Sequence, residues 1–218
     1  MLTRTALYTL VAHGLLARHA VAALAAPSLA ALRPAAALEA GVVCLAPRKE
    51  YNHFLRKAAI LLVEHTERGT LGVNLESPTL LTIGEAASGL VTGRLAENCL
   101  FMGGEYGGRG ATMIHAQSDL AGARPLGSSG LYLGGLAAAA ERVDAGDADA
   151  DDFKFFFNFA KWGPRELDDA VADGRWTAYD GVPEDISLRQ DRNADAGALW
   201  SELDRAAKAN LRAAAADE

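Results

Sequence analysis

The stretch Gly41–Pro78, GVVCLAPRKEYNHFLRKAAILLVEHTERGTLGVNLESP, indicates the fold of this chain. It contains two short apolar runs, Gly41–Pro47 and Ala58–Val63, and both have the length and composition of buried strands. Glu64–Gly69 reads as a turn, and the alternation in Thr70–Leu75 is typical of the returning strand of a hairpin. The stretch therefore predicts a β-sheet built around this hairpin.

Strands and helices follow one another irregularly in the rest of the chain. Phe153–Ala160 predicts a strand, because alternate residues of a strand point to opposite faces. One face would present Phe153, Phe155, Phe157 and Phe159, and the other Lys154, Phe156 and Asn158. We expect further strands at 99–102, 112–115, 130–133 and 176–179, and helices at 79–90, 136–143, 164–173 and 199–211. This order favours an α+β fold, a single domain with flanking helices, over a doubly wound sheet.

Composition excludes several protein classes. The 218 residues carry a formal net charge of −7, and half of them are hydrophobic, as in one globular domain. No apolar run reaches the roughly 20 residues of a spanning helix, so we predict no transmembrane span. Cys44 and Cys99 are too few for a disulfide scaffold or a four-cysteine zinc site. The acidic balance and the lack of a basic recognition helix argue against nucleic-acid binding.

The charge is unevenly distributed along the chain. Residues 1–38 contain three arginines and no acidic residue, which gives them a charge of +3 and leaves −10 on residues 39–218. Such an Ala/Leu-rich, acid-free segment is typical of an organelle transit peptide, although a retained docking helix would have the same composition. We therefore expect a leader at 1–38, a domain at 39–210 and a polar tail at 211–218. The predicted location is an organelle, a plastid before a mitochondrion, or the cytoplasm if the leader does not target the chain.

Familiar catalytic motifs are missing from the sequence. The glycine cluster Gly103–Gly110 has Arg109–Gly110 where a phosphate-binding loop needs Lys followed by Ser or Thr, so a tight turn or close packing explains it better. No GxSxG elbow, HExxH or CxxC occurs. His65, beside Glu64 and Glu67, reads as a hydrogen-bonded structural histidine. We accordingly assign no catalytic residue, no cofactor and no metal.

Four ordered blocks resemble the YqgE/AlgH family. They are Gly41–Pro78, CLFMGGEYGGRGATMIHAQ at 99–117, FNFAKWGPRELDDAVADGRW at 157–176 and ALWSELDRA at 198–206. The resemblance implies a single α+β domain around a distorted, barrel-like mixed sheet, and it implies no established enzymatic activity. Its candidate motif positions in this chain are His65, Gly72, Asn74, Gly103, Gly104, His115, Trp162 and Gly163.

Two departures from the family pattern involve acidic residues. Where relatives usually show Asn-Arg-Pro, this chain has Asn74-Leu75-Glu76-Ser77-Pro78, so the arginine is lost. Where relatives usually show Gly-Gly-Pro, Glu105 follows the glycine pair. If the arginine and this loop bind an anion in relatives, we do not expect this chain to bind one there.

Three functional hypotheses remain open. The first is a non-enzymatic regulatory or protein-interaction module in an organelle, with an unidentified protein partner; it predicts an exposed apolar patch. The second is an accessory or assembly subunit that associates peripherally with an organelle membrane complex. The third is a small-molecule-binding enzyme, which requires His65, Asn74 and His115 to converge on one pocket.

Overall fold

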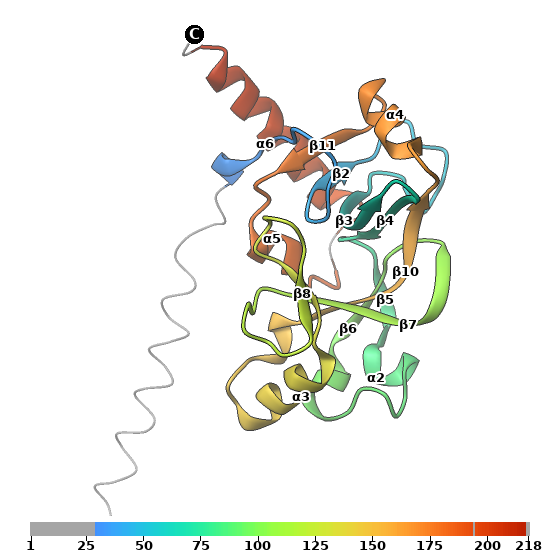
Figure 1. Cartoon of the computed structure of the whole chain (residues 1–218), viewed down its shortest axis with the longest axis vertical. Helices are drawn as coiled ribbons and strands as arrows, with labels where there is room; N and C mark the ends of the chain where they lie inside the picture. Colours follow the sequence, from blue (N-terminus) through green and yellow to red (C-terminus); the bar gives the residue numbers. More distant parts are fainter. Residues whose placement is uncertain (1–28, 194, 217–218) are drawn as a thin grey trace, which may run out of the picture.

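A computed structural model describes residues 29–193 and 195–216, and an 11-stranded sheet runs through this part of the chain (Figure 1). Its strand order is β1-β11-β2-β3-β4-β10-β7-β9-β8, and β5 and β6 form a branch that joins at β10. The strands are β1 (Arg33–Pro34), β2 (Val43–Leu45), β3 (Ala59–Thr66), β4 (Gly69–Asn74), β5 (Pro78–Thr82), β6 (Cys99–Met102), β7 (Tyr106–His115), β8 (Ala123–Pro125), β9 (Tyr132–Gly134), β10 (Lys154–Trp162) and β11 (Thr177–Asp180).

The hairpin predicted from the sequence is confirmed. β3 and β4 pair antiparallel from Ile60 opposite Asn74 to Thr66 opposite Gly69, and β2 pairs with the other edge of β3. The strand expected at 58–63 runs on to Thr66, so the connecting turn is shorter than the six residues expected. Alternate residues of β3 pack into two different core clusters, with Leu61 in one and Ile60 in the other, because both faces of this strand are covered.

The sheet is open, which corrects the barrel-like expectation. β1 and β8 form its two ends and do not pair with each other, so the strands do not close into a cylinder. Pairing is predominantly antiparallel, and β6 with β10 is the one parallel pair of strands in the described chain. The α+β class and the single domain are confirmed.

The sheet forks at β10. β7 follows one edge of β10, while the other edge pairs first with β6, at Phe155–Phe157, and then with β4, at Ala160–Trp162. Asn158 lies between these two pairings with a positive φ of 61°, and the register of β10 shifts there. Such a bulge redirects a strand and lets two neighbours share one edge.

The phenylalanine strand follows the predicted alternation as far as the bulge. Phe156 is fully buried although it lies opposite to Phe155, because a core cluster covers each face of β10. Lys154 is fully buried as well, whereas Phe157 is 38% exposed. Phe155 and Phe156 thus face opposite clusters as predicted, whereas Phe159, beyond the bulge, packs against the cluster of Phe156 and departs from its predicted face.

Short helices cover the sheet, and one prediction for them is wrong. Residues 78–82 form strand β5 instead of a helix, and a capping box between Thr82 and Glu85 starts a single helical turn at Ile83. Leu80 is consequently fully exposed. The helices are η1 (Leu29–Ala31), α2 (Ile83–Ala86), η2 (Gly93–Glu97), α3 (Leu136–Ala145), η3 (Ala150–Asp152), α4 (Glu166–Ala172), α5 (Glu184–Leu188) and α6 (Ala198–Ala214).

The C-terminal helix and the first described residues pack together. α6 buries Leu199, Trp200, Leu203 and Ala207, as its amphipathic pattern predicts, and it continues to Ala214, into the stretch assigned to the tail. Asn210 donates hydrogen bonds from Nδ2 to the carbonyls of Leu29 and Leu32 at 2.8 and 2.9 Å. Part of the predicted leader, 29–38, thus contacts the sheet through β1, whereas residues 1–28 lie outside the described residues. None of the described helices is long and apolar enough to cross a bilayer.

Candidate functional site

The motif glycines meet where the sheet forks. The N–H of Gly103 donates to the carbonyl of Phe157 at 2.7 Å, and its own carbonyl accepts from the N–H of Asn74 at 2.9 Å. Gly103 thereby bridges β10 and β4 at the point where the bulge separates them. A Cβ on Gly103 would clash with the carbonyl of Asn158, and one on Gly104 with the backbone of Phe159 and Ala160. Close backbone packing, the alternative to a phosphate loop, therefore explains this glycine pair.

Asn74 connects the fork to the loop at 48–57. Its side chain is 92% buried; Oδ1 accepts from the N–H of Glu76 at 3.1 Å, and Nδ2 donates to the carbonyl of Phe54 at 3.5 Å. Gly72, two residues earlier in β4, has no room for a side chain because a Cβ would clash with Ile60. The structure thus brings Asn74, Gly103 and Gly104 together, with Gly72 on the same strand.

His65 lies at the far end of the β3–β4 hairpin. Its Nδ1 is 2.7 Å from Oγ1 of Thr70, and its Nε2 is 3.5 Å from Oδ1 of Asp168 on α4. Both ring nitrogens therefore face a polar partner on a neighbouring element. This arrangement matches a structural histidine that joins the hairpin to α4.

His115 is fully buried at the end of β7. Its ring packs against Tyr132 and Phe153, with centroids 5.9 and 5.6 Å away, and Nδ1 accepts from the N–H of Gln117 at 3.1 Å. Burial lowers the pKa of His115, which favours the neutral ring. The backbone of Gly134 raises the pKa and partly offsets this effect, although Nε2 makes no well-formed hydrogen bond.

The three side chains of the enzyme hypothesis do not converge. His65 and Asn74 lie at opposite ends of the hairpin, about 13 Å apart at the usual rise per strand residue, since His65 pairs with Thr70. His115 is two strands away, beyond β10. No shared pocket can form from His65, Asn74 and His115, and the hypothesis built on that pocket is wrong.

The remaining motif residues, Trp162 and Gly163, support packing near α4. The ring of Trp162 meets that of Trp176 edge-on, with centroids 5.3 Å apart, inside the core cluster that α4 covers. The N–H of Gly163 donates to Glu166 at 2.8 Å, which fixes the start of α4.

The two acidic departures from the family pattern have structural partners. Oε1 of Glu76 accepts from the N–H of Leu199 at 2.6 Å, and so Glu76 caps α6, whose own N-cap residue is a glycine without a side chain. Oε1 of Glu105 accepts from Nδ2 of Asn52 at 2.9 Å and ties its loop to the loop at 48–57. Burial raises the pKa of Glu76.

Lys154 is the buried polar residue that sequence reasoning overlooked. Its Nζ donates to the carbonyls of Leu75, Ser187 and Arg189 at 2.7, 3.2 and 2.6 Å, and it lies 4.3 Å from the ring centroid of Phe101. Three acceptors match the three N–H bonds of an ammonium group. The sequence places this lysine in a phenylalanine-rich strand (FKFFF), but a lysine on a strand can equally be exposed, as Lys161 is, so the pattern does not reveal its burial.

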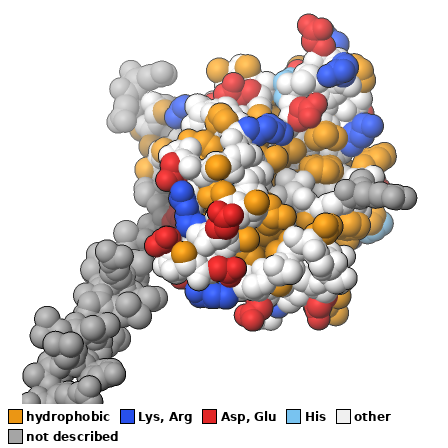
Figure 2. Space-filling model, turned by 60° about the horizontal axis from the view of Figure 1, so that its bottom comes forward, with side chains coloured by type: hydrophobic (Ala, Val, Ile, Leu, Met, Phe, Trp, Pro, Cys, Tyr) orange, Lys and Arg blue, Asp and Glu red, His pale blue; other side chains and the backbone are white. Residues whose placement is uncertain are grey.

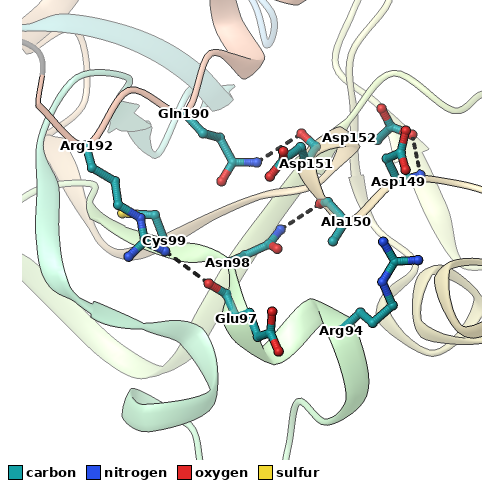
Figure 3. A pocket seen from close by; sticks show the side chains of 10 residues that line it. All are labelled: Arg94, Glu97, Asn98, Cys99, Asp149, Ala150, Asp151, Asp152, Gln190 and Arg192. Carbon is teal, nitrogen blue, oxygen red and sulfur yellow. Dashed lines mark hydrogen bonds between the residues drawn. The ribbon is translucent and has the colours of Figure 1, made fainter. Parts of the chain in front are cut away.

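A polar groove of about 600 Å³ lies between η2 and the Asp149–Asp152 segment (Figure 3). Nδ2 of Asn98 donates to the carbonyl of Ala150, and an Nη of Arg192 donates to that of Glu97. The one thiol in its lining, Cys99, has a pKa raised by burial, which makes it a weak nucleophile. The groove thus contains both signs of charge, but its lining offers no activated nucleophile. In the described part of the chain no three His, Cys, Asp or Glu side chains are placed to bind a metal ion.

An apolar hollow of about 120 Å³ opens beside α2. Leu90 and Phe157 are its exposed large side chains, at 74% and 38%, and its other lining residues are Ile83, Ala86, Ala87, Leu100, Gly110 and Ala111. The end of the molecule that bears α2 and α3 shows hydrophobic side chains gathered among charged ones (Figure 2). Exposed leucine and phenylalanine around a hollow of this size could accept one or two apolar side chains of another molecule.

Comparison with known proteins identifies relatives of this chain. A family model described as AlgH-like matches residues 44–211. A UPF0301 protein of Streptomyces avermitilis is 27% identical over 154 residues, which are 67% of this chain and 75% of the relative. A UPF0301 protein of Chlorobium luteolum is 24% identical over 147 residues, 67% of this chain and 76% of the relative.

Two solved structures have a similar fold. The crystal structure of protein DIP2367 from Corynebacterium diphtheriae has a TM-score of 0.60 at 19% identity, over 78% of this chain and 87% of the other. The solution structure of the AlgH protein from Pseudomonas aeruginosa has a TM-score of 0.51 at 18% identity, over 84% and 90% of the two chains. At these identities the similarity concerns the fold alone.

Proposed function

Because the chain belongs to the AlgH-like family, and because Asn74, Gly103 and Gly104 shape the fork of its sheet, we propose that it acts as a non-enzymatic protein-interaction module. The supporting observation is the apolar hollow, where the side chains of Leu90 and Phe157 are exposed. Burying such side chains against a partner is favourable by about 25 cal/mol per Å² of apolar surface. A regulatory role of the module is part of this proposal.

The motif residues support the same function. Gly103 and Gly104 permit a backbone crossing, Asn74 braces a loop, and His65 joins two elements. Each of these residues stabilises the fold, so recognition of a partner is left to the surface of the molecule.

Site-specific photo-crosslinking in native cells tests this function. A photoreactive p-benzoylphenylalanine replaces Leu90 in one tagged full-length chain, and Leu211, an exposed leucine on α6, in a matched control. We expect a covalent adduct with a second polypeptide from position 90 and none from position 211. Equal adducts from both positions, or none from position 90, would contradict the proposal.

The location that we propose is an organelle, a plastid before a mitochondrion. The support is the composition of residues 1–38, with three arginines and no acidic residue. Fusion of residues 1–38 to a fluorescent protein is expected to direct it to that organelle, with a fusion carrying Arg4→Glu and Arg18→Glu as the control. A mature chain whose first residue is Met1 would favour the alternative, a retained helix that docks the module on a membrane complex.

A further inference from the structure

We propose that two adjacent loops, residues 48–57 and 103–106, form a docking surface for an acidic segment of a partner protein. We call it the two-loop surface. The inference rests on the interaction role proposed above and adds the chemistry of the partner. The two-loop surface shares no residue with the lining of the apolar hollow, so the two surfaces can be tested separately.

Positive charge is concentrated on the first loop. Its sequence, RKEYNHFLRK, contains four basic residues and one acidic residue, whereas residues 39–218 as a whole carry −10. A local cation cluster on an acidic domain attracts anionic groups only at short range, because salt screens charges beyond about 8 Å.

Three of these cations have no carboxylate partner. Arg48 is engaged with Asp204 at 2.6 Å and lies over the ring of Trp200. Lys49, Arg56 and Lys57 are exposed, and among the described residues they make no ion pair and no side-chain hydrogen bond. Arg165, Arg175 and Arg189 differ, since each of them forms an ion pair with a carboxylate. These three side chains are therefore available to another molecule.

Exposed aromatic rings accompany the cations. Tyr51 is 92% exposed and Tyr106 is 53% exposed. The hydrogen bond from Asn52 to Glu105 at 2.9 Å joins the loops that bear these two rings. Tyrosine and arginine are both enriched at protein-protein interfaces.

The first loop is ordered by its own hydrogen bonds. The N–H of Asn52 donates to Oε1 of Glu50 at 2.9 Å, and Oδ1 of Asn52 accepts from the N–H of Phe54 at 3.0 Å. Nδ2 of Asn74 donates a hydrogen bond to the carbonyl of Phe54, which ties the loop to the end of β4. A loop already held in one conformation loses less entropy when it binds, which favours recognition.

The charge distribution favours a short acidic peptide over RNA or a lipid surface. An extended polyanion would approach the whole domain, whose charge of −10 opposes it. A short acidic segment touches only the two-loop surface, where four basic residues outnumber Glu50 and Glu105, and so it avoids most of that repulsion. Apolar residues within the segment would pack on Tyr51 and Tyr106.

A binding assay on the full chain tests this surface. The probe is a fluorescently labelled peptide of alternating Glu and Leu, and the readout is fluorescence anisotropy. We expect wild type to bind, and the triple variant Lys49→Glu, Arg56→Glu, Lys57→Glu to lose about tenfold or more in affinity. The matched control, Arg68→Glu, Lys161→Glu, Arg212→Glu, makes the same charge change at exposed cations elsewhere and should lose less than about threefold.

Several results would overturn the inference. They are no binding of the peptide, an equal loss in the control variant, or tighter loop-dependent binding of single-stranded RNA or of phosphatidylglycerol vesicles than of the peptide. All of these leave the photo-crosslink at position 90 unaffected, so failure of this inference and failure of the interaction role are distinguishable.

Discussion

At the residue scale, Lys154 shows how a charged side chain is accommodated in this core. Its three carbonyl partners come from the β4–β5 connection and from the end of α5, and the rings of Phe101 and Phe156 lie within 5.6 Å. Carbonyls at a helix end lack partners within the helix, and an ammonium group can satisfy them. The sequence pattern places Lys154 on a strand, but its partners are distant in sequence and could not be inferred.

The substitution Lys154→Met should destabilise the protein by about 3 kcal/mol, because three buried carbonyls would lose their donor. Urea denaturation measures the loss. Lys161→Met, at an exposed position of the same strand, should change the free energy of unfolding by less than about 0.5 kcal/mol. Equal effects of the two substitutions would show that burial of Lys154 does not matter.

The same lysine gives the protein a pH-dependent stability. Burial lowers the pKa of Lys154 from 10.5 to about 7. Between these values the unfolded chain binds the proton more tightly than the folded one, so the contribution of this group to the free energy of unfolding rises with pH from about 7 to about 10.

Subtracting the pH profile of Lys154→Met from that of wild type isolates this contribution. We expect a difference that rises from pH about 7 to about 10 and is flat below. A difference that is flat throughout would mean that the three carbonyls keep the ammonium charged in the folded state.

At the scale of elements, the sequence predicts the strands better than it predicts how they cross. The β3–β4 hairpin, the C-terminal helix and the helix ended by Gly174 follow from local patterns and turn residues. The fork at β10 depends on Asn158 adopting a positive φ and on Gly103 filling the gap between strands. The alternation of residues along β10 does not show that β4 and β6 pair with the same edge of this strand. The exposure of Phe157 was therefore not predictable.

Gly104→Ala should destabilise the fork strongly, by more than about 3 kcal/mol, because the added methyl group would clash with the backbone of Phe159 and Ala160. Gly163→Ala is the control at another motif glycine, where only Glu166 lies near the added atom, at 3.5 Å. It should change the free energy of unfolding by less than about 1 kcal/mol. If both variants show the same free energy of unfolding, close backbone packing does not explain why glycines occupy positions 103 and 104.

Glu76→Ala should destabilise α6 by about 1–2 kcal/mol, since the N–H of Leu199 would lose its acceptor. Hydrogen exchange of the amides in the first turn of α6 should become faster. Glu76→Gln retains an acceptor oxygen and should recover most of the loss, whereas Glu141→Ala, an exposed site on α3, should have no effect. If hydrogen exchange of these amides is unchanged in Glu76→Ala, Glu76 does not cap α6.

At the scale of the whole molecule, an open sheet leaves surfaces that a closed barrel would not. The family resemblance in the sequence correctly indicated the α+β class, but the ends of the sheet depend on which strands pair across long separations. The hollow at Leu90 and Phe157 is formed by α2, β7 and β10, which lie far apart along the chain. No local pattern could have combined them.

The most direct test of the interaction role is the mass of the native assembly. Tagged full-length chain, extracted under native conditions from its own cells, is analysed by size exclusion with light scattering, beside a Leu90→Glu, Phe157→Glu variant and a Leu211→Glu control. We predict that wild type and control elute in an assembly larger than one chain that contains a second polypeptide, and that the hollow variant, still folded by circular dichroism, elutes alone. A wild-type chain that elutes as a single chain, or a hollow variant that retains the assembly, would contradict the account.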